Sequence, residues 1–267
     1  MALHESTLDE VLLLEGKLLF GHLGVMLNIR TQNSIAELIP HASNLDPSLV
    51  KDVVTDHTSG IHVLLAPVNV QAGQGIRAEA LYNLVTALQK MYDYLIIDAG
   101  SVLNENSVTL MDLADRILLV STPDLAALHD ISRFIQLSST LAYPPGKLAV
   151  VLNRQGMQGG VKTKDIEMAL HHELFAQIPE DEANVLRSLN RGIPLVLNYP
   201  RSPASQGFRA LAKSLAAVNV AAQAKQASPR AKPTSKRTQT ATKPVSKATA
   251  SQGTASKGTS SQRTASN

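Results

Sequence analysis

Six short apolar runs, each closed by a polar residue or a proline, recur along the first 180 residues of the chain. Continuous apolar runs of this length predict strands that are buried on both faces, as in a parallel sheet. The predicted strands are residues 11–14, 61–66, 94–97, 116–121, 147–154 and 174–178.

Between these runs, apolar residues recur at helical spacing, and this is clearest in residues 77–91. One face of that segment collects its large apolar residues, namely Leu81, Leu84, Val85, Leu88 and Met91. Further helices are predicted at residues 34–39, 47–55, 106–113, 124–140, 163–171, 180–190 and 203–222. The alternation of strand and helix predicts an α/β fold: a doubly wound, mostly parallel sheet with helices on both faces.

The end of the chain has a different composition, dominated from about Lys225 by Ala, Ser, Thr, Lys and Gln. Such a segment buries too little apolar surface to offset the conformational entropy of the chain, so we expect it to be disordered. The expected organisation is one domain over residues 1–222 and a basic low-complexity tail over residues 223–267. The tail is either a solvated appendage or a ligand-binding arm.

The net charge of +3 hides two regions of opposite sign. Nine of the 25 basic residues and none of the 22 acidic residues lie in residues 221–267, so residues 1–220 carry a net charge of −6. The absence of Cys excludes disulfides and thiolate metal sites. Aromatic residues make up only 3% of the chain, which argues against a platform for stacking nucleic-acid bases.

Asp98 closes the apolar run Tyr94–Ile97 and is expected at the carboxyl end of a buried strand. Open α/β sheets bind their ligands at that edge. A carboxylate there is well placed to hold Mg²⁺ beside nucleotide phosphates, as the Walker B acid does. The alternative is a turn or helix cap, because apolar runs that end in Asp are common.

Other catalytic motifs are weak or missing. A Walker A loop, G-x-x-x-x-G-K-[ST], does not occur in residues 1–267. The stretch Gly73–Ala78 matches G-x-G-x-x-[GA] ahead of a helix, but it is not in a tight turn after a strand, so we interpret it as a flexible loop rather than a dinucleotide site. The spacing of the His residues indicates no zinc site, and no G-x-S-x-G elbow supports a hydrolase triad.

Five segments in register resemble the MinD/ParA superfamily of deviant Walker A P-loop ATPases, most closely its CpaE/TadZ pilus-assembly branch. Residues 11–23 resemble its VLLVDxDLxFGDL segment, residues 92–98 its YDYVVVD Walker B strand, and residues 121–125 its TTPDL segment. Residues 152–154 are similar to its LNR motif and residues 178–196 to its IPxD…NxGxPLV stretch. The resemblance covers roughly residues 8–216.

This resemblance implies a dimerising ATPase that binds ATP and Mg²⁺. Asp98 would be the catalytic, Mg²⁺-associated Walker B acid. Asn153 would contact adenine, and Pro179 and Asp181 would lie beside the base. For Asn153 the alternative is a loop residue that caps a turn.

Two departures from the family pattern put ATP turnover in doubt. The phosphate loop and the strand before it should precede Val11, and the chain begins too late to contain them, through either a late start codon or a truncation. In this fold that strand lies inside the sheet, so we expect exposed strand edges on both neighbours. Glu15 and Lys17 replace the two acids of the family's DxD pair, and a lysine neither accepts a proton from water nor ligates Mg²⁺.

The expected role is spatial: marking or assembling a tight-adherence (Flp-type) pilus machine, with impaired ATP binding and hydrolysis. The expected partners are a second copy or a paralogue that contains a P-loop, together with pilus-assembly proteins. A chromosome-partition or septum-positioning ATPase is the runner-up, with weak DNA or anionic-lipid contact through the tail. A purely structural partner of an intact paralogue is the third possibility. We expect a cytoplasmic location, peripheral to the inner membrane face or the cell pole.

Overall fold

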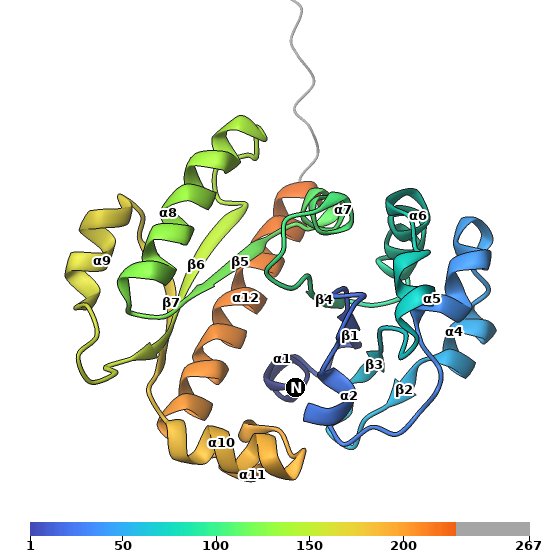
Figure 1. Ribbon diagram of the computed structural model, residues 1–267, viewed down its shortest axis with the longest axis horizontal. Coiled ribbons are helices and arrows are strands. Elements are labelled where there is room, and N and C mark those ends of the chain that lie inside the picture. The colour runs from blue at the N-terminus through green and yellow to red at the C-terminus, as the bar shows by residue number, and fades with distance from the viewer. Residues whose placement is uncertain (228–267) are drawn as a thin grey trace, which may run out of the picture. The chain divides into compact units, whose positions relative to one another are not determined.

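The computed structural model describes residues 1–227, and for residues 220–227 it describes the backbone alone. The described residues form seven strands in two hydrogen-bonded sheets, with helices on both faces (Figure 1). The predicted α/β class is therefore confirmed. The predicted disordered tail falls, from residue 228 onward, outside the described residues, and its boundary at residue 222 stays a prediction.

The first sheet has four strands in the order β2-β3-β1-β4. Strand β1 runs parallel to β3 and β4, whereas the short β2 is antiparallel to β3. The strands are β1 Val11–Glu15, β2 Thr55–Asp56, β3 His62–Leu64 and β4 Tyr94–Asp98. One face packs its leucines and Ile97 against α3 Ile35–Leu38, η1 Ile39–Asn44, α4 Pro47–Val53, α6 Ala78–Leu88 and α7 Glu105–Leu113.

The second sheet has three parallel strands in the order β5-β6-β7. They are β5 Ile117–Ser121, β6 Leu148–Gln155 and β7 Leu174–Pro179. Apolar residues on one face of β6 pack against α8 Leu125–Thr140 and α9 Thr163–Leu170. All six predicted strands are present, and such continuous apolar runs are typical of strands buried on both faces.

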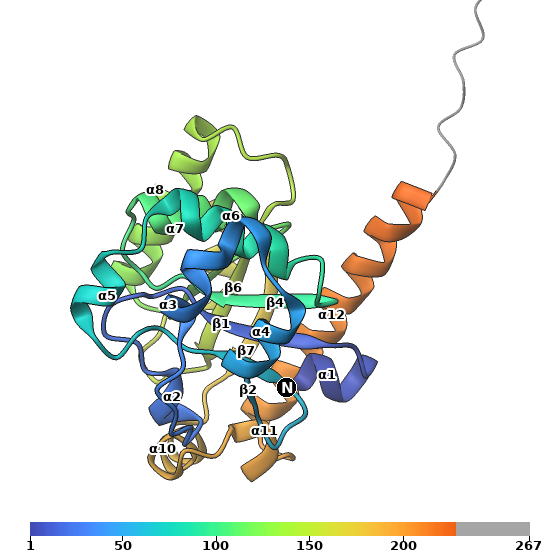
Figure 2. The same ribbon diagram turned by 90° about the vertical axis from the view of Figure 1, so that its right-hand side faces the viewer.

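Helix α12, Pro203–Ala227, packs against both sheets. Its Ala204 and Leu211 belong to the apolar cluster under the second sheet, and its Ala212 and Leu215 belong to the cluster under the first. The cluster under the first sheet also contains Leu3 of α1 Ala2–Thr7. Helix α1 lies beside α12 in both views (Figures 1 and 2). One helix therefore joins the two halves of the fold on a shared face.

Two element predictions are wrong. Thr55 was assigned to the end of a helix, but α4 ends at Val53 and Thr55 pairs with Val63 of β3, because Val54 is extended and directs the chain into the sheet. The loop predicted around Gly73 contains α5 Val70–Gln74, which Asn69 caps by accepting hydrogen bonds from two backbone amides. A Cβ on Gly73 would collide with the Leu18 carbonyl oxygen, so this glycine serves close packing and is not open to a phosphate.

Four short helical segments complete the described part of the chain at the carboxyl ends of the strands or beyond them. They are α2 Leu23–Met26, α5, α10 Glu182–Arg191 and α11 Leu195–Asn198. Helix α10 contacts α2, and a Cβ on Gly192, which ends α10 with a positive φ of 63°, would lie 2.8 Å from Asn28 Cβ. Within residues 1–227 no helix combines the length and the apolar character that a membrane crossing demands.

Arg209 of α12 gives the first prediction. Its guanidinium donates to both carboxylate oxygens of Glu5 in α1, each at 3.0 Å, and also to the backbone carbonyls of Pro200 and Val196. Because Arg209→Ala leaves these acceptors unpaired, we expect the free energy of unfolding to fall by about 1–2 kcal/mol. Arg187→Ala, on exposed α10, is the control and should change it by less than about 0.5 kcal/mol.

The same pair has a defined pH dependence. The hydrogen bond from Arg209 lowers the pKa of the Glu5 carboxyl below its ordinary 4.5. A lowered folded-state pKa means that the stabilisation is present above 4.5 and is lost as the pH falls through the folded-state value. Denaturant melts at neutral and acid pH should show the difference between wild type and Arg209→Ala shrinking in acid; a constant difference would contradict this role.

Candidate functional site

Polar residues gather at the carboxyl ends of strands in each sheet, where open α/β sheets bind ligands. We call Asn153, Arg154, Pro179, Glu180 and Asp181 the β6–β7 cluster, after the strands that carry them or end beside them. The second set, the β1–β4 cluster, is Glu15, Lys17, Asp98 and Gly100.

The β6–β7 cluster is held together by a break in the strand ladder. The register slips between Leu152 and Gln155, and Arg154 adopts a left-handed conformation with φ 57°. Beyond the slip, Gln155 pairs with Pro179 and the Glu180 amide donates to the Gln155 carbonyl at 2.9 Å. Asn153, Pro179 and Asp181 therefore lie at the carboxyl ends of β6 and β7 or directly after them, while their contact with a base stays a prediction.

Arg154 connects the residues at this edge by hydrogen bonds. Its Nε donates to Glu180 Oε2 at 2.6 Å, and the carboxylate raises the pKa of the Arg154 guanidinium. Its backbone amide donates to Asn153 Oδ1 at 3.0 Å, which fixes the orientation of the Asn153 side chain. For the Asn153 Nδ2 group, no hydrogen bond is found among the described residues, so that donor stays available to a ligand.

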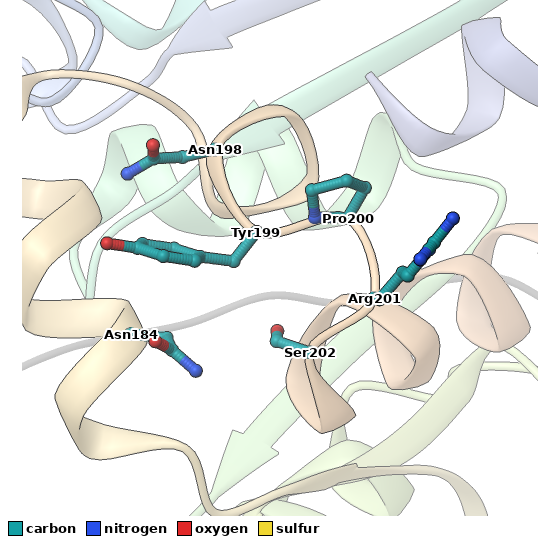
Figure 3. Close-up of a pocket in the computed structure, with 6 residues that line it drawn as sticks. All are labelled: Asn184, Asn198, Tyr199, Pro200, Arg201 and Ser202. Atoms are coloured by element: carbon teal, nitrogen blue, oxygen red, sulfur yellow. The ribbon is translucent and has the colours of Figure 1, made fainter.

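Asp181 carries an unpaired buried oxygen. Its Oδ1 accepts from Asn184 Nδ2 at 2.8 Å, whereas its Oδ2 is buried with no hydrogen-bond partner in the described part of the chain. An unpaired buried acceptor costs about 1–3 kcal/mol. Asn184 also lines a shallow, open pocket of about 290 Å³, which Figure 3 shows between α10 and the segment from Asn198 to Ser202. The side chains of Tyr199 and Asn184 point into this space, and Arg201 points away.

The β1–β4 cluster places its carboxylates side by side in the register, but they face different partners. Glu15 pairs with Asp98 across β1 and β4. Asp98 is exposed, and its Oδ1 accepts from the Gly100 amide at 2.9 Å, which closes a tight turn in which Gly100 has a φ of 70°. Lys17 lies against this turn, since a Cβ on Gly100 would be 3.2 Å from Lys17 Cγ.

The sequence did not reveal the structural role of Glu15. It is the only charged residue in the buried class within residues 1–219, with 3% of its surface exposed. Its Oε1 accepts from the Leu23 amide at 2.8 Å and its Oε2 from the Ala66 amide at 3.1 Å. The carboxylate thus joins the ends of β1 and β3 to α2, and a Cβ on Gly21 would overlap it. The available signal was an acid between an apolar strand and two glycines at positions 16 and 21.

The two clusters fit the implied ATP unequally. Adenine offers an N–H donor at N6 and acceptors at its ring nitrogens, so the free Asn153 donor and the unpaired Asp181 acceptor complement it. For the phosphates and Mg²⁺ the fit is poorer: the Glu15 carboxylate already accepts from two backbone amides, and Lys17 can pair with a phosphate but cannot ligate Mg²⁺. Within residues 1–227 no group of three His, Asp or Glu side chains is arranged to hold a metal ion. Asp98 is therefore not part of such a group.

The polar groups of residues 122–124 make hydrogen bonds within the described chain. Asp124 caps α8 by accepting from the Ala127 amide at 3.0 Å, and the Thr122 hydroxyl donates to its other oxygen, which lowers the pKa of the Asp124 carboxyl. The Pro123 carbonyl accepts from the Val161 amide at 2.8 Å. The conformation after β5 is therefore defined without a ligand.

No family model matches the chain. The chain is 30% identical over 213 residues to an uncharacterised ATP-binding protein of Methanocaldococcus jannaschii, covering 79% of this chain and 78% of that protein.

Solved structures share the fold. A ParA family ATPase from Chlorobium tepidum superposes with a TM-score of 0.74 at 24% identity, covering 80% of this chain and 88% of that one. The septum site-determining protein MinD of Pyrococcus horikoshii, solved with Mg-ADP, superposes with a TM-score of 0.69 at 21% identity, covering 82% and 88%. The expectation that strands and helices follow the MinD/ParA arrangement is confirmed.

Glu15 gives the prediction for this site. Glu15→Gln keeps the shape of the side chain but replaces one carboxylate oxygen by an NH₂ group. That group is a donor and would face a backbone N–H, which is also a donor. We expect the free energy of unfolding to fall by about 1–3 kcal/mol. Glu173→Gln, on the surface, is the matched control and should be nearly neutral. Equal urea midpoints for the two variants would show that the buried carboxylate does not hold the β1 and β3 ends together.

Proposed function

Because the chain belongs to the MinD/ParA superfamily of ATPases, we propose that it is a spatial-positioning protein whose own residues bind the base of ATP but handle the phosphates poorly. The observation that carries this proposal is the contrast between the two clusters. The β6–β7 cluster presents a free donor and an unpaired buried acceptor, whereas the β1–β4 cluster presents one exposed carboxylate and a lysine.

In this proposal Asn153 and Asp181 contact adenine, and Pro179 packs beside it. Close packing supports the position of Pro179, since a Cβ on Gly207 of α12 would lie 2.8 Å from Pro179 Cδ. Asp98 is the Mg²⁺-associated acid, acting with phosphate oxygens and water as the remaining ligands. Hydrolysis by residues 1–267 is impaired because Lys17 cannot activate water.

The positioned structure is a tight-adherence (Flp-type) pilus machine, and the chain acts at a cell pole or the inner membrane face. Support comes from the resemblance of residues 11–23 and 121–125 to the CpaE/TadZ branch. Its partners are pilus-assembly proteins and a second copy or a P-loop-containing paralogue. The second candidate is septum-site or chromosome positioning, which the septum site-determining MinD of Pyrococcus horikoshii favours as a structural neighbour.

Nucleotide titration tests the divided site. Calorimetry with adenosine and with Mg-ATP should give dissociation constants within about threefold of each other, both weaker than about 100 µM, because the phosphates add few contacts. No steady release of phosphate is expected. Asp181→Asn replaces the unpaired acceptor by a donor or a flipped amide and should weaken adenosine binding about tenfold.

Asp165→Asn, at an exposed position of α9, is the control and should leave adenosine binding unchanged. Micromolar binding of Mg-ATP with steady turnover, together with no binding of adenosine, would overturn the proposed division.

The cellular role is tested by deleting the gene in its native cell and imaging a fluorescent fusion. We expect the fusion at discrete foci that coincide with pilus assembly sites, and a loss of surface pili in the deletion strain. Intact pili with misplaced septa or missegregated chromosomes would instead favour the second candidate.

A further inference from the structure

Exposed apolar side chains gather on three neighbouring helical segments, α2, α10 and α11. Helix α10 contacts α2, which lies beside it in both views (Figures 1 and 2), and α11 packs against α10. A Cβ on Gly192, at the end of α10, would lie 3.3 Å from the Val25 carbonyl oxygen of α2. We call the exposed apolar residues of these segments the α2–α10 face, namely Val25, Met26, Leu186, Leu189, Ile193 and Leu197.

The exposed apolar residues of α10 follow a helical stripe. Leu186, Leu189 and Ile193 recur at spacings of three and four and are 53%, 43% and 41% exposed. A different side of α10 already anchors the helix, since Val185 packs against the apolar cluster under the second sheet and Ser188 is buried. The stripe is therefore a second apolar side of α10, and the contacts made within residues 1–227 leave it open to solvent.

The same face is basic, although the domain that carries it is acidic. No Asp or Glu occurs in residues 16–36 or after Glu182, whereas residues 1–220 as a whole are net acidic. The exposed side of α10 carries Arg187 and Arg191, four residues apart, and the exposed Arg30 follows α2. Among the described residues, none of these three arginines forms an ion pair. Their positive charges are therefore available to an anionic partner.

We propose that the α2–α10 face binds the surface of an anionic phospholipid bilayer, with its apolar side chains at the boundary between headgroups and acyl chains. Interfacial helices bind in this way, because apolar residues enter the boundary while Arg side chains stay with the headgroup phosphates. Each Lys or Arg close to an anionic surface strengthens the attraction. The proposal rests on the inner-membrane part of the proposed function and not on the binding of adenine.

Two other occupants match the face less well. A symmetric dimer through this face would bring the same arginines of both copies together, and like charges repel across an interface. A nucleic acid would match the arginines, but the exposed leucines would then meet phosphate and sugar oxygens, with which they make no hydrogen bonds. A lipid surface is the partner whose chemistry uses both the apolar and the basic side chains.

A tryptophan reporter on the full chain tests the proposal, because the chain contains no Trp. Leu189→Trp is mixed with vesicles of phosphatidylglycerol and phosphatidylcholine, and separately with vesicles of phosphatidylcholine alone. We expect its emission to shift to shorter wavelength with the anionic vesicles only, since the indole ring moves from water into the headgroup boundary. Met168→Trp is the matched control and should show no shift, because Met168 is 65% exposed on α9, which also carries Asp165 and Glu167.

Cosedimentation with the anionic vesicles measures the affinity. Leu186→Ser combined with Leu189→Ser should weaken vesicle binding at least about tenfold, because apolar area is lost from the boundary. Arg187→Gln combined with Arg191→Gln should also weaken it at least about tenfold. Met168→Ser should leave it unchanged. Unchanged urea midpoints and unchanged adenosine binding would show that the variants fold and keep the β6–β7 cluster.

The same measurements distinguish the other partners. Vesicle binding without an emission shift of Leu189→Trp would show that the basic tail, rather than the α2–α10 face, contacts the lipid, and would overturn the proposal. An emission shift on self-association without vesicles, or with a DNA duplex but not with vesicles, would overturn it in favour of a second copy or a nucleic acid. A chain that binds adenosine but no vesicles would overturn this inference and leave the base-binding part of the proposed function standing.

Discussion

The described fold depends on α12, because the strands alone do not connect its two halves. A parallel sheet normally derives its cohesion from an unbroken ladder of backbone hydrogen bonds, and here the ladder ends at β4 and resumes at β5. The apolar clusters on one shared face place α12 against both sheets, and Arg209 ties it to α1 as well. Side-chain packing thus replaces main-chain pairing across the interruption. Side-chain packing buries apolar surface, but it does not satisfy the backbone groups of the two strand edges.

The interruption also separates the parts of the candidate site. The β6–β7 cluster stands on one sheet and the β1–β4 cluster on the other, so a nucleotide that used both would depend on the placement of two sheets that share no hydrogen bond. Within the β6–β7 cluster, Arg154 donates hydrogen bonds to Asn153 Oδ1 and Glu180 Oε2. The β1–β4 cluster is organised around structure instead, with Glu15 bound to two backbone amides. The residues expected to contact the base and the residue expected beside Mg²⁺ therefore lie on different sheets.

Much of this could be predicted from the sequence, and the reasons differ between elements. The six apolar strands follow from burial, and the resemblance alone put Asn153, Pro179 and Asp181 at the carboxyl ends of two adjacent strands, where the structure has them. The role of Glu15 could not be predicted, because its partners are the amides of Leu23 and Ala66, which no side-chain pattern reports. The helix around Gly73 was hidden for a similar reason: the packing of that glycine on the Leu18 backbone outweighs its low helix propensity.

The central claim is that β4 and β5 have no strand between them within residues 1–227. Native-state hydrogen exchange on the full chain measures this most directly. The account predicts that alternate amides of β4 and β5, those facing the interruption, exchange by local opening, while amides of β1 and β6 exchange only on global unfolding. Uniform protection across β1, β4, β5 and β6 would contradict the account, because it would require the two edges to be paired.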